Sequence, residues 1–400
     1  MSEMSYLEKL LDGVEVEWVT LGSMADIGTG SSNRQDESEN GIYPFYVRSK
    51  NILKSDTFEF DEVAIVIPGE GGIGDIFHYV EGKYALHQRA YRIRITTNAV
   101  DTKFLYYFMS SSFKQYILTK SVGATAISIR KPMLEGFKVP IPSPDNPEKS
   151  LAIQSEIVRI LDKFTALTAE LTAELNMRKK QYNYYRDQLL SFNTEDVPHL
   201  PMGQKDIGEF IRGGTFQKKD FIDAGVGCIH YGQIYTYYGT YTEKTKTYIS
   251  TALAKKCKKA QKGDLIIATT SENDEDVCKA VAWLGSEDIA VSSDACIYKH
   301  NLNPKYVSYF FQTEQFQNQK RQYITGAKVR RVNADNLSKI LIPVPSMEIQ
   351  ERIVSILDKF DTLTNSITEG LPREIELRQK QYEYYRDLLF SFPKPETASN

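Results

Sequence analysis

The sequence RKKQYNYYRDQLLSF occupies residues 178–192, and a near copy, RQKQYEYYRDLLFSF, occupies residues 378–392, at an offset of 200 residues. Upstream of each copy stands the motif ILDKF, at residues 160–164 and again at 356–360, at an offset of 196 residues. The second copy therefore carries four additional residues between its two motifs. Because each copy of a long internal repeat folds as one structural unit, the 400-residue chain is predicted to hold one plan twice.

Two further landmarks extend the repeat toward the N-terminus. A Gly-Ala pair at residues 123–124 recurs at 326–327, and VPIP at 139–142 recurs as IPVP at 342–345, both at an offset of 203 residues. Between the landmarks, the two halves share little beyond similar length and many tyrosines and phenylalanines. The predicted plan is a variable domain followed by a constant segment, twice.

The constant segments have the pattern of long helices. Apolar and aromatic side chains recur every three or four residues over 153–192 and over 349–392, which places them in one stripe along a helix. Two such helices can pair as an antiparallel coiled coil, and a four-residue insertion keeps the stripe nearly in phase. Gly370 and Pro372 predict a break or kink near the insertion. An alternative stays open, in which each helix lies independently on its own domain.

The variable domains mix strands and helices. Buried strands are predicted at 63–72 (VAIVIPGEGG) and 263–271 (GDLIIATTS), and one alternating, edge-facing strand at 84–95 (YALHQRAYRIRI). Helices are predicted at 104–117 and 306–319. The fold class is α+β, with two globular domains separated by two long antiparallel helices in a pseudo-two-fold repeat. The predicted boundaries, in chain order, are variable domain 1 at 1–150, constant helix 1 at 151–192, variable domain 2 at 193–345, constant helix 2 at 346–392 and a tail at 393–400.

Composition excludes several classes of protein. The hydrophobic share of 41% is that of a globular chain, and neither a run of roughly 18 apolar residues nor a secretory signal is present. We therefore expect a cytoplasmic protein without a membrane partner. The cysteines are widely spaced, which predicts reduced packing residues rather than a metal site or a disulfide framework; they are Cys228, Cys257, Cys278 and Cys296.

Motifs for catalysis or cofactor binding are missing. Residues 69–74 satisfy GxGxxG, but the stretch that follows is rich in β-prone residues and does not open a helix that could hold a pyrophosphate. The sequence contains neither GxxxxGK[ST] nor HExxH, and it has no Pro-Pro dipeptide of the kind that amino-methyltransferases use. The chain is therefore predicted to be non-catalytic.

Positive charge is concentrated in short stretches. The net charge of −3 argues against a nucleic-acid partner when it is taken alone. Yet Asp101 is the one acid in residues 82–134, and acids are also absent from 244–263 and 315–334. Basic stretches interleaved with Tyr, Gln, Asn and Ser supply partners for phosphates and base edges. Both variable domains are therefore candidates for contact with DNA.

Two variable domains, each followed by ILDKF and QYxYYRD motifs (160–192 and 356–392), resemble the specificity subunit of a type I restriction–modification enzyme. The resemblance covers the whole chain. The tandem tetrapeptides TAEL at 168–171 and 172–175 are most similar to the IC-like subfamily. Because variable domains differ between members of that family, the recognised sequence does not carry over.

The resemblance implies a mechanism. Each variable domain would be a target-recognition domain that reads one half of a bipartite site in double-stranded DNA. The helices would set the spacing and dock two modification subunits, which methylate adenine N6 with S-adenosylmethionine. Two restriction subunits would add ATP- and Mg-dependent translocation and cleavage, so the chain itself needs no cofactor and no catalytic residue.

Candidate DNA contacts are side chains in or beside the recognition segments that can donate or accept hydrogen bonds. They are Lys83, His87, Gln88, Arg89, Arg130 and Lys131 in the first domain, and His230, Tyr231, Gln233, Ser271, Asn273, Lys328, Arg330 and Arg331 in the second. Tyr184 and Tyr384 lie off the apolar stripe and are candidates for the modification-subunit interface. The tyrosines on the stripe are assigned to the helix-pair core, namely Tyr182, Tyr185, Tyr382 and Tyr385.

Two other functions stay open at this point. A coiled-coil scaffold without DNA specificity would retain no particular DNA sequence with its partners. A dinucleotide-dependent oxidoreductase built on residues 63–80 would bind NAD in a saturable way. Neither function accounts for the duplicated plan.

Overall fold

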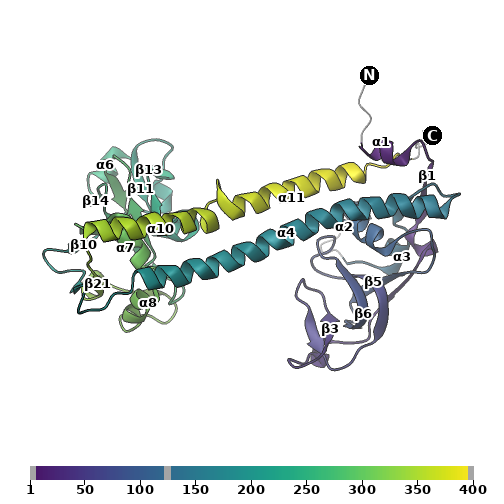
Figure 1. Cartoon of the computed structure of the whole chain (residues 1–400), viewed down its shortest axis with the longest axis horizontal. Helices are drawn as coiled ribbons and strands as arrows, with labels where there is room; N and C mark the ends of the chain where they lie inside the picture. The colour runs from purple at the N-terminus through teal and green to yellow at the C-terminus, as the bar shows by residue number, and fades with distance from the viewer. Residues whose placement is uncertain (1–5, 121–127, 395–400) are drawn as a thin grey trace, which may run out of the picture. The chain divides into compact units, whose positions relative to one another are not determined.

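A computed structural model describes residues 6–120 and 128–394 of the chain. Contacts divide the chain into two compact units (Figure 1). Unit 1 holds residues up to Glu170 together with those from Ile375 onward, and unit 2 holds Leu171–Glu374. Each unit therefore combines one variable domain with parts of both constant segments.

Unit 1 is built on a six-stranded sheet of order β2-β7-β5-β6-β3-β4, in which only the β3–β6 pair is parallel. A two-stranded ribbon, β1-β8, leads into the long helix. The elements are α1 (Tyr6–Leu11), β1 (Val16–Thr20), η1 (Leu21–Ser23), β2 (Ala25–Thr29), η2 (Arg34–Asp36), β3 (Tyr43–Tyr46), β4 (Leu53–Ser55), β5 (Phe60–Pro68), β6 (His78–Leu86), β7 (Ala90–Ile95), α2 (Thr102–Lys120), α3 (Lys131–Glu135), β8 (Lys138–Pro142) and α4 (Pro147–Leu189).

Unit 2 repeats this plan with a five-stranded sheet, β10-β19-β15-β17-β12, and a four-stranded sheet, β13-β11-β18-β14. Two small pairs, β16-β20 and β21-β9, complete it. The elements are β9 (His199–Pro201), β10 (Gly208–Arg212), η3 (Lys218–Asp220), β11 (Val226–Ile229), α5 (Tyr231–Thr236), β12 (Tyr241–Thr242), β13 (Thr247–Ile249), α6 (Thr251–Ala254), β14 (Lys259–Ala260), β15 (Leu265–Ala268), β16 (Thr270–Ser271), β17 (Ala280–Trp283), β18 (Ile289–Val291), β19 (Ala295–His300), α7 (Pro304–Phe310), α8 (Glu314–Arg321), β20 (Arg330–Arg331), α9 (Ala334–Leu337), β21 (Leu341–Pro343), α10 (Met347–Asn365) and α11 (Gly370–Leu389).

In unit 1 the core lies on both sides of α2, which stands between the sheet and α4 (Figure 1). Its buried face carries Phe104 and Phe113, which pack with Ile65 of β5 and Leu161 of α4. Full burial of one large apolar side chain contributes about 1.5–3 kcal/mol. The α2 helix therefore fixes the variable domain to the constant helix through apolar packing on two faces.

The strand predicted over 84–95 is two strands, and neither lies at the sheet edge. β6 ends at Leu86 and β7 begins at Ala90, with a tight turn between them. The turn is held because the His87 N–H donates to Tyr46 and the Ala90 N–H donates to the His87 carbonyl. The sequence concealed it because the turn contains no glycine, proline or asparagine.

The helix predicted over 306–319 is likewise interrupted. α7 ends at Phe310 and α8 begins at Glu314. The hydroxyl of Thr313 causes the break: it donates to the carbonyl of Phe310 (2.7 Å) and accepts from the N–H of Phe316 (3.2 Å). One threonine thus ends one helix and caps the next. The helix predicted over 104–117 is confirmed as part of α2.

The first constant helix is continuous from Pro147 to Leu189, whereas the second is divided into α10 and α11. The break covers residues 366–369, beside the insertion. Gly370 has φ +78°, and a Cβ there would lie 2.4 Å from the carbonyl oxygen of Thr362. This position therefore requires glycine.

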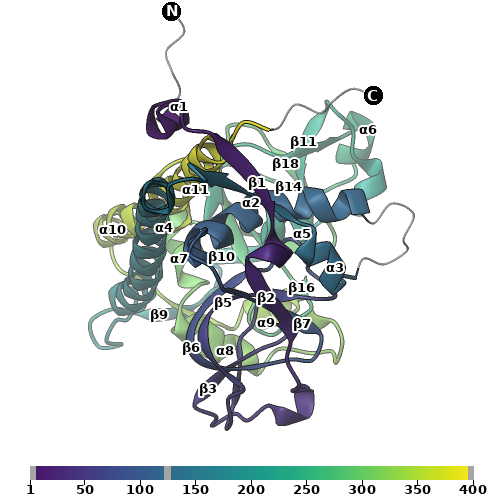
Figure 2. The ribbon, with the colours of Figure 1, turned by 90° about the vertical axis from the view of Figure 1, so that its right-hand side faces the viewer.

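The helices of the two repeats pair inside each unit, in opposite directions (Figures 1 and 2). In unit 1, Phe164 stacks on Tyr385, with ring centroids 5.4 Å apart. In unit 2, Phe360 stacks on Tyr185 at 5.7 Å. The phenylalanine of each ILDKF motif therefore meets a tyrosine of the other repeat. This pairing excludes the alternative of two independent helices.

Candidate nucleic-acid interface

The candidate interface in unit 1 forms where four segments meet: residues 46–48, 69–70, 87–89 and 128–130. We call this the strand junction of unit 1. Gly69 is needed because the turn passes so close that a Cβ would lie 2.8 Å from the Arg89 carbonyl oxygen. Backbone hydrogen bonds hold it, donor first: Ser32 N to Leu86 O (3.1 Å), His87 N to Tyr46 O (2.9 Å), Gly69 N to Arg89 O (2.8 Å), Ala90 N to His87 O (2.9 Å) and Ile129 N to Gly69 O (2.9 Å).

Unit 2 contains the same junction, formed by residues 229–231, 269–271, 292–294 and 330–332. Each bond of unit 1 has a counterpart: Gly214 N to Val291 O (2.7 Å), Ser292 N to Ile229 O (3.1 Å), Thr269 N to Asp294 O (3.0 Å), Ala295 N to Ser292 O (3.1 Å) and Val332 N to Thr269 O (3.1 Å). Two dissimilar sequences therefore build one backbone framework. The side chains that it carries differ between the units.

Three charged side chains meet at the junction of unit 1. The Oε2 atom of Glu70 accepts from Nη1 of Arg89 (3.1 Å) and from Nη1 of Arg48 (3.0 Å). The hydrogen bond from Arg89 is the main reason why the pKa of Glu70 lies below its usual value, and Arg48 lowers it further. The predicted contact Arg89 is therefore joined by Arg48 and Glu70, which the sequence did not single out.

His87 and Gln88 lie in the same turn. His87 is buried, and its Nδ1 accepts from the N–H of Arg89 (3.0 Å). Burial lowers the pKa of His87, with smaller contributions from Arg48 and Arg89, so its ring is neutral near pH 7. The Gln88 side chain is exposed. Of these two residues, Gln88 offers its side chain to a ligand while His87 supports the turn.

The other three candidates of unit 1 lie at different distances from the junction. Arg130 directly follows the junction residue Ile129 and is exposed at the N-terminus of α3. Lys131 is 3.8 Å from Glu135. Lys83, in contrast, lies on β6 with its ammonium 4.6 Å from the ring of Phe58. The structure therefore brings Arg130 to the junction and leaves Lys83 outside it.

In unit 2, the candidates of α5 are held by interactions within the domain. His230 caps the helix: its Nδ1 accepts from Gly232 N (3.2 Å), and burial lowers its pKa. The Gln233 side chain accepts from His230 N (2.9 Å) and donates to Thr247 (3.1 Å). Tyr231 occupies the junction position equivalent to Arg48, with its ring partly exposed. Only Tyr231 therefore presents its side chain at the junction.

Ser271, Arg330 and Arg331 lie on the paired strands β16 and β20. Nε of Arg330 lies 2.7 Å from Asp274 Oδ1, and Asn273 donates to Asp276 at 2.7 Å. Arg331 and Lys328 are exposed. Ser271, Arg330 and Arg331 therefore lie within the junction, and the carboxylate of Asp274 is paired with one of its cations.

The acid-free stretches of sequence are only partly basic surfaces in space. In residues 82–134, six of the nine cations form ion pairs with acids from other segments or from the following helical turn: Arg89, Arg92, Arg94, Lys103, Lys114 and Lys131. In residues 315–334, Lys320 is buried and donates to the carbonyls of Glu275 (3.0 Å) and Val277 (2.9 Å). The acid-free stretches therefore carry less unpaired positive charge at the surface than the sequence indicated.

Residues 244–263 behave differently. Across the described part of the chain, none of their lysines forms an ion pair. Most are exposed, on the turns around β13, α6 and β14. These lysines are Lys244, Lys246, Lys255, Lys256, Lys258, Lys259 and Lys262. They give unit 2 a cationic surface that phosphates can approach.

One carboxylate in each ILDKF motif attaches the variable domain to its helix. In unit 1, Asp162 accepts from Lys103 (2.8 Å) and from the hydroxyl of Tyr107 (2.6 Å). In unit 2, Asp358 accepts from Lys305 (2.8 Å) and Tyr309 (2.7 Å) in the same way. We call each of these groups of three a helix latch. The latches account for the aspartate of the repeated motif.

The candidate partner residues Tyr184 and Tyr384 are exposed on the helices, at 60% and 65%. Tyr182 is buried, while Tyr185 and Tyr385 stack in the helix pairs and keep one side in solvent. The structure therefore leaves equivalent tyrosines accessible in both repeats.

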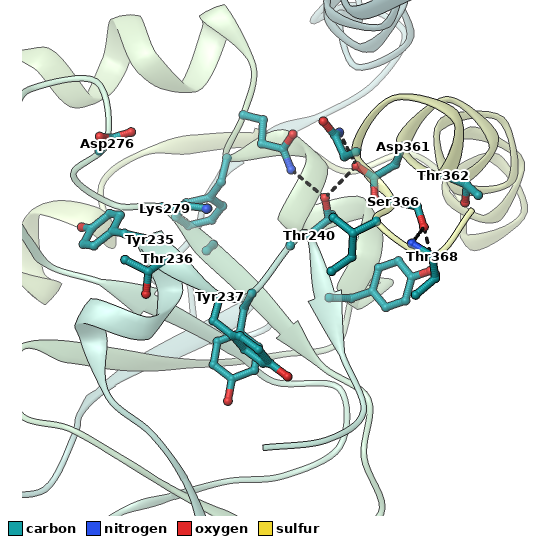
Figure 3. A pocket seen from close by; sticks show the side chains of 18 of the residues that line it. Tyr235, Thr236, Tyr237, Thr240, Asp276, Lys279, Asp361, Thr362, Ser366 and Thr368 are labelled. Atoms are coloured by element: carbon teal, nitrogen blue, oxygen red, sulfur yellow. Dashed lines mark hydrogen bonds between the residues drawn. The ribbon is translucent and has the colours of Figure 1, made fainter. Parts of the chain in front are cut away.

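A groove of about 820 Å³ lies in unit 2 beside the break between α10 and α11 (Figure 3). Asp361 of α10 lines this groove, and it accepts from Asn365 (2.8 Å) and Thr240 (3.4 Å). Burial raises the pKa of Asp361 and lowers that of Lys279 on the groove wall. These polar contacts join α10 to the domain, as the latch does.

The GxGxxG stretch leads into strand β6 rather than into a helix, which agrees with rejection of the dinucleotide motif. The Gly-Ala pair at 123–124 lies outside the described residues, whereas Gly326 has φ +91°.

Among residues 6–120 and 128–394 there is no cluster of three or more His, Cys, Asp or Glu side chains that could hold a metal ion. In the same residues, no helix is long and apolar enough to cross a membrane.

The fold and the two junctions define a class of protein: a tandem repeat of α+β domains on paired helices, in which one backbone framework presents different side chains from each copy. The family model for the type I restriction modification DNA specificity domain matches residues 13–178 and 201–377. The chain therefore belongs to this family. It is a non-catalytic specificity subunit that recognises DNA and works with modification and restriction subunits.

Individual relatives agree with this assignment. The chain is 40% identical to the type I restriction enzyme EcoR124I/EcoR124II specificity subunit of Escherichia coli, over 100% of both chains. It is 32% identical to a putative type I restriction enzyme specificity subunit of Haemophilus influenzae, over 97% of this chain and 98% of the relative.

Solved structures share the fold. The S subunit of a type I restriction–modification system from M. genitalium matches with a TM-score of 0.54 and 15% identity, over 98% of this chain and 100% of that one. A chain from a study of complex assembly and conformational transition of the type I R-M system matches with a TM-score of 0.61 and 11% identity, over 94% and 97%. The IC-like subfamily stays a prediction.

Proposed function

We propose that each unit reads one half of a bipartite site in double-stranded DNA, with the side chains of its strand junction facing the bases. The observation that supports this is the pair of junctions: one set of backbone hydrogen bonds, carrying unrelated side chains. A protein that reads two different half-sites with a duplicated fold needs this combination. Arg130, Gln88 and Arg89 would act in unit 1, and Tyr231, Ser271, Arg330 and Arg331 in unit 2.

The remaining candidates have supporting roles in this proposal. Lys83 and Lys131, and Lys328 in unit 2, would contact phosphates rather than base edges. His87, His230, Gln233 and Asn273 hold the turns that carry the reading residues, because their side chains already bond within the domain. This division predicts base-specific effects for the first group and general effects on affinity for the second.

The paired helices would set the spacing between the half-sites and dock two modification subunits, one through each exposed tyrosine, Tyr184 and Tyr384. Adenine N6 methylation with S-adenosylmethionine, and cleavage with ATP and Mg, would then belong to the two modification and two restriction subunits. This chain would bind no cofactor, and the complex would act in the cytoplasm.

The test is to express the full chain with its cognate modification subunit and to map methylated adenines in host DNA. We expect one bipartite motif with a fixed gap. Exchanging residues 1–150 for the first domain of another family member should change one half of the motif and leave the other half intact. A change in both halves, or methylation without a bipartite motif, would contradict the proposal.

A further inference from the structure

Two arginines at the junction of unit 1 share a single carboxylate oxygen. Arg48 follows β3, Glu70 follows β5 and Arg89 lies between β6 and β7. Both arginines donate through Nη1 to Oε2 of Glu70, at 3.0 and 3.1 Å. Three residues from separate segments therefore form one charged cluster, which we call the arginine pair with Glu70.

The backbone beneath this cluster is fixed. Gly69, next to Glu70, donates to the Arg89 carbonyl, and Ile129 donates to the Gly69 carbonyl. The N–H of Arg89 is itself bound by the buried His87 ring. Arginine side chains otherwise have many conformations, and the shared carboxylate restricts both. A ligand would therefore bind two guanidinium groups whose positions are fixed before it arrives.

The cluster is also accessible and keeps a net positive charge. The side chains of Arg48, Glu70 and Arg89 are 47%, 43% and 56% exposed. A guanidinium has five N–H donors in a planar fork, and the bond to Glu70 uses one nitrogen of each. The remaining N–H donors are suited to a ligand that has two closely spaced hydrogen-bond acceptors. In DNA, the O6 and N7 atoms of guanine in the major groove are such a pair.

We infer that Arg48 and Arg89 are the guanine-reading residues of the first half-site and that Glu70 is the positioning residue for both. This inference rests on the proposed function. A carboxylate beside phosphates would be repelled if it were unpaired, and its place between two arginines removes that cost.

Unit 2 supplies an internal control. The equivalent junction positions hold Tyr231, Thr270 and Asp294, as the matching backbone bonds define them. The guanidinium pair is therefore specific to one unit. Its loss should affect one half of the methylated motif only.

The experiment uses the full chain, expressed with its modification subunit, and measures base preference at each motif position from mapped methylation. Arg48→Ala and Arg89→Ala should each lower the preference for guanine at a first-half position by roughly tenfold to a hundredfold. Arg48→Lys and Arg89→Lys keep the charge but lose the planar fork, so they should lose the same preference. Glu70→Gln should relax both positions, less strongly.

The control is Arg159→Ala, which removes an arginine that is ion-paired with Glu156 on α4 and should leave the motif unchanged. An intact second half in each variant shows that the chain is folded. The inference is overturned if the first half contains no guanine, if base preferences persist in the arginine variants, or if they reduce methylation equally for all sequences. Failure of the proposed function differs, because the unaltered protein would then give no bipartite motif.

Discussion

The two strand junctions have the same backbone hydrogen bonds but carry different side chains at equivalent positions. Where unit 1 places Arg89, unit 2 places Asp294, and where unit 1 places Arg48, unit 2 places Tyr231. The helix latches, in contrast, are the same in both units: a lysine and a tyrosine donate to the aspartate of the ILDKF motif. The two repeats therefore share the contacts that attach each domain to its helix and differ in the side chains that the junction presents.

The two units should differ most in how much stability they lose when a phenylalanine at the end of a constant segment is replaced. Phe392 is buried in the core of unit 1, near Phe104, whereas its repeat partner Phe192 is only partly buried. Phe392→Ala should lower the free energy of unfolding by about 3–4 kcal/mol, and Phe192→Ala by about 1–2 kcal/mol. Urea unfolding of the full chain measures both, and Phe392→Leu should recover most of the loss. Equal losses would mean that the two ends are packed alike.

The stability of unit 2 is expected to depend on pH through His300. Burial lowers the pKa of His300 in unit 2 to about 4, and its Nδ1 accepts from Leu302 N (3.2 Å). The unfolded chain takes up a proton on His300 more readily than the folded chain does. The neutral ring therefore makes its full contribution to the free energy of unfolding above about pH 6.5. It is lost as the pH falls toward 4, by about 3 kcal/mol in total.

His300→Asn, which keeps an acceptor for the Leu302 amide, should reduce this pH dependence. The measurement is urea unfolding of the parent and the variant at pH 7 and pH 4.5. At the equivalent sheet position unit 1 has Ile95, so the effect should be confined to unfolding of unit 2. A parallel decline in parent and variant would rule out His300 as the cause.

The smallest difference is expected at the latches. Asp358→Ala leaves the buried hydroxyl of Tyr309 and the ammonium of Lys305 without their acceptor, which should cost about 2–3 kcal/mol. Asp162→Ala should cost about 1–2 kcal/mol, because Lys103 and Asp162 are more exposed to water. Thermal unfolding of both variants, with Asp358→Asn as the conservative control, tests the ranking. A larger loss for Asp162→Ala would reverse it.

The sequence predicted the duplicated plan because ILDKF and the tyrosine-rich motif are local and repeated. It also singled out Arg89 and Arg130, which lie in basic stretches and which the structure brings to the strand junction of unit 1. It did not find Arg48 and Glu70, because each owes its place to strand pairing between distant segments. Strand pairing also explains why cations in the acid-free stretches form ion pairs. Arg92 has no acid near it in sequence, yet β2 and β5 bring Asp26 and Glu62 to it.

The buried Phe390 and Phe392 have a consequence for the synthesis of the chain. Unit 2 is one continuous stretch, Leu171–Glu374, so its residues are synthesised before the second segment of unit 1. Unit 1 begins first, but its core includes three side chains from the end of α11 and the residues just after it, Leu389, Phe390 and Phe392. At a translation rate of roughly 5–20 residues per second, the synthesis of the intervening unit 2 delays completion of the core of unit 1 by roughly 10–40 seconds.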